Sequence, residues 1–419
     1  MTRETWKTQT WWSIPVYTGD VSGVCSALYE LGGMVVMHDP SGCNSTYNTH
    51  DEIRWSHSES LIFLSGLTQM DAITGNDRRL IDDIVSAANQ FHPQFIAIAG
   101  SPVPWLIGTD FAAVCARVTL ETGIPAFHVE TNAMHDYTRG AGQAFLKLAK
   151  MLFEICTMAS GGKSGRNAEK PFGGIPGNLS GKVRVNVLGM TPLDFTNPCE
   201  TGNLKEALGD RGFEVVSVWA MGDPENPLPG IRKSLQSDVN LVVSSCGIDT
   251  ARWMEETFGI PYVVGIPCGA FADVLFASLS ESARDGKSRI PYLDDPGPDP
   301  GQRDKSISGK EAAMAQGAFA GRCVAGETVM AGSLAANLRH QDGKACDMVP
   351  LTETVRGLIP AGAICPKGER QIRQVLGAYE EVIGDPMLRQ AVRCGCRFEE
   401  LPHFALSGRV FLDRIRPLI

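Results

Sequence analysis

The chain has 419 residues, a formal net charge of −9 at pH 7 and 20% charged residues. This length predicts two or three compact domains at roughly 100 to 200 residues each, and an acidic chain without a basic stripe argues against nucleic-acid binding. No apolar run approaches the roughly 18 residues of a membrane span, and the first residues carry no signal-peptide pattern, so we expect a cytoplasmic protein.

Strand and helix signals alternate along the chain. Apolar runs that predict buried strands lie at residues 35–38, 95–100, 183–190 and 239–245. A helical pattern follows each of the last three. Two of these units end in the same way, with Gly-Ile-Pro at 123–125 and 259–261, where a helix stops and the next buried strand begins. This repeated order of strand, loop, helix and strand predicts parallel sheets flanked by helices, which is an α/β fold.

Two polar segments interrupt this order. Residues 161–182 are rich in Gly, Ser, Lys and Asn, and residues 285–304 hold four prolines among several aspartates. Both compositions are typical of linkers or surface excursions. We therefore divide the chain into three βα lobes, which span 1–170, 171–305 and 306–419. Because open parallel sheets bind ligands at the carboxyl ends of their strands, we expect functional residues just after 95–100 and 239–245.

Twelve cysteines are many for a protein of the reducing cytosol. Disulfides are disfavoured there, so the count points to metal or cluster ligation, to catalysis, or to buried thiols that pack as small hydrophobes. Cys43 follows a Pro-Ser-Gly turn after a strand, with His38 five residues earlier, and is a candidate metal ligand or nucleophile. Upstream, Asp20 and Cys25 offer a carboxylate and a second thiol, although Cys25 also falls on an apolar helix face that suits a core residue.

Several motifs resemble one known family. His38–Cys43, Gly75-Asn76 and Ile107–Asp110 stand in the order and spacing of the first domain of the nitrogenase component 1 superfamily. That superfamily includes the large nitrogenase subunits, their cofactor-assembly scaffold, tetrapyrrole reductases and cyclases, and methylthio-alkane reductases. The resemblance implies three Rossmann-like lobes with mainly parallel sheets flanked by helices.

The resemblance also implies an iron–sulfur cluster at a subunit interface, either a [4Fe–4S] cluster or one like the nitrogenase P-cluster. Cys43 matches the second of the family's cysteine ligands, and the first falls near Asp20 or Cys25 depending on the gap. The third position is occupied by Ser101-Pro102, which places a full P-cluster in doubt, since such clusters are held by soft thiolates.

Two further segments resemble those that hold the catalytic cofactor in the nitrogenase α-subunit. Cys246 stands at the matching strand end and implies a nitrogenase-type iron–sulfur cofactor there; a buried loop cysteine is the alternative. His403 lies one place from the family's histidine ligand and is a candidate ligand or proton donor. His135 follows a strand that lines the same crevice and is a further candidate catalytic residue. Ala141 stands near the place of the family's substrate-side histidine, which argues against dinitrogen as the main substrate.

The chain has no phosphate-binding loop, so the resemblance implies a separate iron protein that hydrolyses ATP and delivers electrons. The other implied partner is a homologous large subunit in a heterotetramer, or a second copy in a homodimer. The expected function is a nitrogenase-like two-component reductase, with reductive C–S cleavage of methylthio-alkanes as the closest branch. The alternatives are a tetrapyrrole reductase or cyclase with one [4Fe–4S] cluster, and a non-catalytic scaffold for cofactor assembly.

Overall fold

The computed structural model describes residues 18–40, 52–56, 58–159, 181–221, 227–294, 321–361 and 363–419. Its described strands form three four-stranded sheets, and every strand pairs with its neighbours in parallel. The α/β fold with parallel sheets is therefore confirmed. The divisions expected near residues 170 and 305 lie outside the described residues, as does Cys43.

The first sheet has the strand order β2-β1-β3-β4. Its central strand β3 was expected from the apolar run 95–100. Asp110 caps helix α5 (Phe111–Thr122) by accepting from the Ala113 amide, and Gly123 ends that helix in the left-handed conformation, at φ 70°. The elements are α1 Asp20–Leu28, β1 Met34–His38, β2 Leu61–Leu64, α2 Gln69–Thr74, α3 Arg78–Phe91, β3 Ile96–Gly100, α4 Pro102–Ile107, α5 Phe111–Thr122, β4 Ala126–Val129 and α6 Tyr137–Ala159.

The second sheet has the order β6-β5-β7-β8, which repeats the winding of the first. The apolar run 183–190 is a strand over its full length, and Gly259 ends α9 as expected, at φ 71°. The elements are β5 Val183–Met190, α7 Glu200–Asp210, β6 Phe213–Ala220, α8 Pro227–Arg232, β7 Val239–Val242, α9 Ile248–Phe258, β8 Tyr262–Val264, α10 Phe271–Asp285 and α11 Pro291–Asp294, with short 3₁₀ helices η2 at Lys233–Gln236 and η3 at Ser245–Gly247.

The third sheet has the order β10-β9-β11-β12, again the same winding. Its elements are β9 Arg322–Gly326, α13 Thr328–Asp342, β10 Cys346–Pro350, α14 Glu369–Leu376, β11 Glu381–Gly384, β12 Arg397–Glu400 and α15 Phe404–Ser407, with 3₁₀ helices η5 at Pro386–Ala391 and η6 at Gly408–Arg414. In all three sheets the chain therefore reverses its winding between the two central strands.

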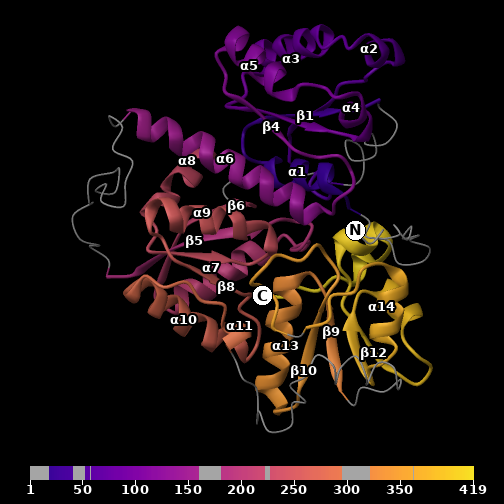
Figure 1. The fold of residues 1–419 in the computed structure, drawn as a ribbon. Coiled ribbons are helices and arrows are strands. Elements are labelled where there is room, and N and C mark those ends of the chain that lie inside the picture. Colours follow the sequence, from indigo (N-terminus) through magenta and orange to yellow (C-terminus); the bar gives the residue numbers. More distant parts are fainter. Residues whose placement is uncertain are drawn as a thin grey trace, which may run out of the picture.

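The long helix α6 lies between the first and second sheets, and the third sheet stands beside the second (Figure 1). Helix α1 packs tightly on α6 through glycines. A Cβ at Gly140 would lie 1.9 Å from the Asp20 carbonyl oxygen, and one at Gly23 would lie 2.2 Å from the Tyr137 carbonyl oxygen. This close approach positions the start of α6 where the three sheets meet. Among the described helices, none has the length and apolar content to cross a bilayer.

Candidate functional site

Polar side chains follow the central strands of the second and third sheets. Asp194 comes shortly after β5, Cys246 after β7, Glu327 after β9 and Asp385 after β11. In the second sheet the chain reverses its winding between β5 and β7, and in the third sheet between β9 and β11. In open parallel sheets such a reversal opens a crevice at the carboxyl edge. All four side chains are buried, so the two edges meet at a closed junction within the protein.

The Asp194 carboxylate is the centre of this junction. Its Oδ1 accepts a short hydrogen bond from the Tyr137 hydroxyl and lies 3.2 Å from His403 Nε2. Its Oδ2 accepts from the Ser244 hydroxyl at 2.6 Å and from the Thr191 hydroxyl at 3.3 Å. Asp194 is 5% exposed, so these donors replace the water that a buried carboxylate loses. The carboxylate thereby ties α6 and the C-terminal part of the chain to the second sheet.

Cys246 lies in η3, directly after β7, and its thiol is fully buried. Its Sγ lies 3.9 Å from Asp194 Oδ2, the geometry of a weak S–H donor. Burial raises the pKa of the Cys246 thiol well above its usual range, and the nearby Asp194 charge raises it further. These two effects favour the neutral thiol, although Cys246 lies just before the N-terminus of α9. Iron ligation would require its deprotonation.

His403 joins the same carboxylate from the third sheet. Its amide donates to Asp385 at 2.8 Å, which fixes the backbone before α15, and its ring is 4% exposed. Because the Asp194 carboxylate can only accept, Nε2 is the donor in this contact. Nδ1, on the other side of the ring, is buried without a hydrogen-bond partner among the described residues.

Glu327 connects the second and third sheets next to Cys246. Its carboxylate accepts from the Ser245 amide at 3.0 Å and caps α13 through the amides of Val329 and Met330. Burial raises the pKa of Glu327, and the Asp194 charge raises it further. The Cys246 segment is therefore held at the start of a helix of the third sheet.

His135 lies two residues before Tyr137, in the segment between β4 and α6. Its Nδ1 is 2.8 Å from Glu353 Oε1, and both side chains are partly exposed, at 31% and 40%. The Glu353 amide donates to Asp136 at 2.5 Å, so this pair of contacts joins the turn after β4 to the segment after β10. The structure thus places His135 between the first and third sheets, whereas Tyr137 reaches Asp194 directly.

The remaining expected metal ligands lie in α1 or outside the described residues. The Asp20 carboxylate accepts from the amides of Asn132 at 3.0 Å and Ala133 at 2.9 Å, so it anchors the turn after β4. Burial raises its pKa, and the backbone hydrogen bonds oppose this. Cys25 is fully buried, and burial raises the pKa of its thiol. Cys25 thus occupies a core position, which the sequence allowed as the alternative to a ligand role. Metal ligation by Asp20, Cys25 and Cys43 stays a prediction.

The carboxyl edge of the first sheet precedes Cys43. Here His38 Nδ1 lies 2.8 Å from the Ser65 hydroxyl, and burial lowers the pKa of His38 to about 4. Asp39 is 1% exposed, and neither of its carboxylate oxygens has a hydrogen-bond partner within the described residues. The buried hydroxyl of Ser101 also lacks one there. This edge therefore carries polar groups whose bonding the described chain does not complete.

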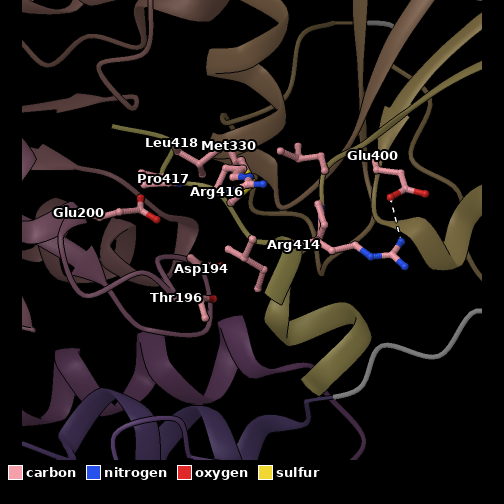
Figure 2. Close-up of a pocket in the computed structure, with 12 residues that line it drawn as sticks. Asp194, Thr196, Glu200, Met330, Glu400, Arg414, Arg416, Pro417 and Leu418 are labelled. Atoms are coloured by element: carbon pink, nitrogen blue, oxygen red, sulfur yellow. Dashed lines mark hydrogen bonds and ion pairs between the residues drawn. The ribbon is translucent and has the colours of Figure 1, made fainter. Parts of the chain in front are cut away.

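A cavity of about 130 Å³ opens beside Asp194. Figure 2 shows it between the start of α7 and the last residues of the chain, with the Glu200 carboxyl directed into it. Its walls are Asp194, Thr196, Glu200, Met330, Glu400, Leu401, Pro402, Arg414, Ile415, Arg416, Pro417 and Leu418. Asp194 thus faces the buried cluster on one side and this cavity on the other.

The donor chemistry of the junction fits a metal-containing group. Cys246 offers one sulfur and His403 one imidazole nitrogen that the described residues leave unpartnered, which are ligand types that iron–sulfur and transition-metal groups take. Asp194 supplies the hydrogen bond that orients the histidine ring, as carboxylates commonly do behind metal-bound histidines. Within the described ranges, no three His, Cys, Asp or Glu side chains converge on a single metal-ion site.

Three residues of the junction, Asp194, Tyr137 and Glu327, were not expected from the sequence. Asp194 follows the predicted strand 183–190 and Glu327 follows β9, so the carboxyl-end rule applied to every strand would have identified them. Tyr137 carries no such signal, because its role depends on how α6 crosses the second sheet.

Comparisons with known proteins agree with this architecture. The family model for nitrogenase component 1 type oxidoreductases matches residues 23–290. One subunit of the light-independent protochlorophyllide reductase of Nostoc punctiforme is 26% identical over 197 residues, which cover 46% of this chain and 36% of that protein. The nitrogenase iron-molybdenum cofactor biosynthesis protein NifE of Methanosarcina barkeri is 23% identical over 234 residues, 54% of this chain and 46% of that protein. The chain thus spans less than half the length of these relatives.

Among solved structures, nitrogenase Cp1 at pH 5 superposes with a TM-score of 0.51 at 16% sequence identity, over 92% of this chain and 72% of that one. The same protein at pH 6.5 gives a TM-score of 0.50 at 17% identity, over 82% of this chain and 63% of that one. At this level of identity the likeness concerns the fold.

Proposed function

The chain belongs to the nitrogenase component 1 type oxidoreductases, and from this premise we propose that it is the catalytic subunit of a nitrogenase-like two-component reductase. In this proposal a separate iron protein hydrolyses ATP and delivers electrons, and the substrate is reduced at the junction of the second and third sheets.

One observation carries the proposal. Cys246, His403 and Tyr137 come from three distant parts of the chain, and all three contact the carboxylate of Asp194. A buried histidine nitrogen that finds no partner in the described chain is costly in a purely structural core, because a polar atom that loses water and gains no hydrogen bond costs about 1 to 3 kcal/mol. Its retention beside a buried thiol supports a ligand-binding role for this junction.

Cys246 and His403 would hold the metallocofactor, whose chemistry when bound is the storage and transfer of low-potential electrons. Asp194 orients the His403 ring through Nε2, and Nδ1 is the ring nitrogen left without a partner among the described residues. Tyr137 and Ser244 fix the Asp194 carboxylate in turn. The closed packing around the cluster excludes bulk water, which strengthens each of these electrostatic contacts.

Electrons would enter through an iron–sulfur cluster at the contact with a second large subunit, either a homologous chain or another copy. Cys43 would be one ligand, and Asp20 or Cys25 another, in the lobe that we assign to residues 1–170. Residues 171–305 would carry the Cys246 site, and residues 306–419 would supply His403. His135, at the contact of the first and third sheets, would be a further residue that handles protons.

For the substrate we propose a methylthio-alkane. Reductive cleavage of its C–S bond consumes two electrons and two protons and yields a C–H bond and a thiol. The candidate cofactor ligands Cys246 and His403 support a branch that carries a cofactor, and the absence of the substrate-side histidine at Ala141 supports a substrate other than dinitrogen.

A second candidate function is tetrapyrrole reduction with a single [4Fe–4S] cluster. The match to the protochlorophyllide reductase subunit favours it, as does the contact between the Cys246 thiol and Asp194, since in that case Cys246 would not be a ligand. A third candidate, a scaffold for cofactor assembly, is favoured by the match to NifE. It predicts bound metal without turnover.

The test is iron and sulfide analysis with EPR on the complex purified anaerobically after co-expression with its partner chains. About four irons per half-complex supports the tetrapyrrole branch, and many more support a cofactor-bearing reductase. Cys43→Ala should lose the cluster iron and abolish electron transfer, whereas Cys199→Ala, at an exposed thiol, serves as the matched control. Full iron and activity in Cys43→Ala would overturn the interface assignment.

A further inference from the structure

The third sheet carries a pair of cysteines that the proposed function does not use. Cys394 and Cys396 flank Gly395 in the turn just before β12, and we call residues 393–396 the Cys-Gly-Cys turn. Cys394 is exposed and Cys396 is partly exposed, whereas Cys323 and Cys346 in the same sheet are buried. The two thiols of this turn are therefore open to small molecules in solution.

The turn holds the two cysteines at a spacing that a disulfide can bridge. The Cys396 amide donates to the Arg393 carbonyl oxygen at 3.2 Å, and Gly395 adopts φ 87°, the left-handed conformation that favours glycine. Because consecutive Cα atoms are about 3.8 Å apart, a bend at Gly395 places the Cα atoms of the two cysteines about 5.5 Å apart. Disulfides usually join Cα atoms that are roughly 4.4 to 6.8 Å apart. A bond between Cys394 and Cys396 therefore needs no large change of the backbone.

The surroundings of the two thiols give them different reactivity. Burial raises the pKa of the Cys396 thiol and the Glu381 charge adds to the rise, whereas the Arg393 charge and a hydrogen bond from the Val382 backbone lower it. Arg393 also stands directly before Cys394, and both are exposed. An exposed thiolate beside a cation is the form that attacks a disulfide. Cys394 is thus the thiol that meets an incoming disulfide first, with Cys396 beside it.

The turn is separate from the other cysteines and from the junction. Cys396 packs against the hydrophobic cluster that contains Cys323, and burial raises the pKa of the Cys323 thiol well above its usual range. A buried neutral thiol of this kind is inert, so Cys323 does not compete with Cys394 as the nucleophile. The turn lies at the amino end of β12, whereas His403 follows the carboxyl end of that strand.

We propose that Cys394 and Cys396 form a dithiol redox site that exchanges with small disulfides of the glutathione type. The Cys394 thiolate attacks one sulfur of the small disulfide, and the other sulfur leaves as a thiolate that takes up a proton. The Cys396 thiolate then attacks the Cys394 sulfur of the mixed disulfide, and the second small thiol leaves in the same way. In sum, the two cysteines lose two electrons and two protons, and the small disulfide gains them to become two thiols.

The short distance between the two cysteines makes this bond reversible. A disulfide stabilises a fold mainly by closing a long loop, and a loop of three residues gains little. The bond is therefore readily reduced again, so the site follows the balance between small disulfides and small thiols around it. This inference goes beyond the proposed function and does not depend on it.

The test exposes the purified full-length chain, under anaerobic conditions, to mixtures of oxidised and reduced glutathione. Remaining thiols are alkylated, and a protease that cleaves after glutamate leaves both cysteines in one peptide, residues 382–399, which holds no other cysteine. As the share of oxidised glutathione rises, this peptide should lose two hydrogens and take up no alkylating group. Two free thiols at every mixture, or a stable glutathione adduct in place of the internal disulfide, would overturn the dithiol site.

Two variants separate the roles of the two thiols. Cys396→Ser should keep one glutathione on Cys394, because no second thiol displaces it. Cys394→Ser should react with glutathione disulfide at least about 10-fold more slowly at this turn, since the half-buried Cys396 is the poorer nucleophile. Equal rates in Cys394→Ser and the wild type would contradict the order of attack and overturn the proposed step.

Cys199 is the matched control within each sample. Its thiol is exposed but has no neighbouring cysteine in the sequence, so it should gain glutathione without forming an internal disulfide. Loss of the glutathione adduct from Cys199 at the same rate as from Cys394 in the wild type would show that Cys396 plays no part, and would overturn the proposal. No reductase turnover enters these measurements, so they decide the redox site whether or not the proposed function holds.

Discussion

The first and second sheets have the same strand order, but the polar side chains at their carboxyl edges are hydrogen-bonded differently. After β5 and β7, the Asp194 carboxylate accepts hydrogen bonds from Tyr137, Ser244 and His403. After β1 and β3, Asp39 and Ser101 are buried without partners in the described part of the chain. With the same topology, the Asp194 carboxylate is therefore hydrogen-bonded on both oxygens, whereas the Asp39 carboxylate has no partner among the described residues.

We propose different roles for the two edges. A carboxylate that is hydrogen-bonded on both oxygens can hold a reacting site rigidly, because it fixes the side chains around it. An edge with unpaired polar groups suits a contact with another chain or an inorganic group, since an isolated buried carboxylate is costly. The comparison is thus consistent with electron entry near Cys43 and reduction near Cys246.

Asp194→Ala tests the closed edge and should have the largest effect. It removes the acceptor of four buried donors, namely the Tyr137, Ser244 and Thr191 hydroxyls and the His403 ring. Each lost bond costs about 1 to 3 kcal/mol before relaxation, so we expect the free energy of unfolding to fall by roughly 3 to 5 kcal/mol. Urea titration of the purified chain measures it. Asp249→Asn, on the exposed side of α9, should stay within about 0.5 kcal/mol of the wild type. A loss below about 1 kcal/mol for Asp194→Ala would show that the network is not a stabilising unit.

Glu200 should make stability fall as the pH rises. Its pKa goes from 4.5 in the unfolded chain to about 7 in the folded one, so its contribution is complete below about pH 4.5 and is lost as the pH rises through about 7. At 1.36 kcal/mol per unit this amounts to roughly 3 kcal/mol. Urea midpoints between pH 5 and 8 should therefore be flatter for Glu200→Gln than for the wild type. Parallel curves for the two proteins would contradict the buried, protonated state of Glu200.

Asp39→Asn tests the open edge and should have the smallest effect. The substitution removes no hydrogen bond among the described residues, so the free energy of unfolding of the isolated chain should change by less than about 1 kcal/mol. The measurement is the same urea titration. A loss as large as that of Asp194→Ala would mean that the first edge is also a closed network, and the contrast between the two sheets would disappear.

Much of the fold could be predicted from local patterns. The run 183–190 and the glycines at 123 and 259 were assigned correctly because a buried strand and a left-handed helix end each depend on a few adjacent residues. The short helix α4, which begins at Pro102, was not predicted from the sequence. A serine cap followed by proline in the first turn is a helix-start signal that would have indicated it.

The site could be predicted only in part. Cys246 and His403 were identified individually, but their meeting at Asp194 depends on how the second and third sheets face each other, and no local pattern encodes that arrangement. The same holds for Glu200, whose side chain is buried by the segment around Leu418, more than 200 residues along the chain.

The most direct test of the account compares electron uptake with product formation in the anaerobic complex supplied with iron protein and ATP. His403→Gln should still accept electrons, seen as the EPR signal of the reduced interface cluster, but should form product at least about 100-fold more slowly. His340→Gln, at an exposed histidine on α13, should match the wild type in both. Product formation at the wild-type rate in His403→Gln would contradict reduction at the Asp194 junction.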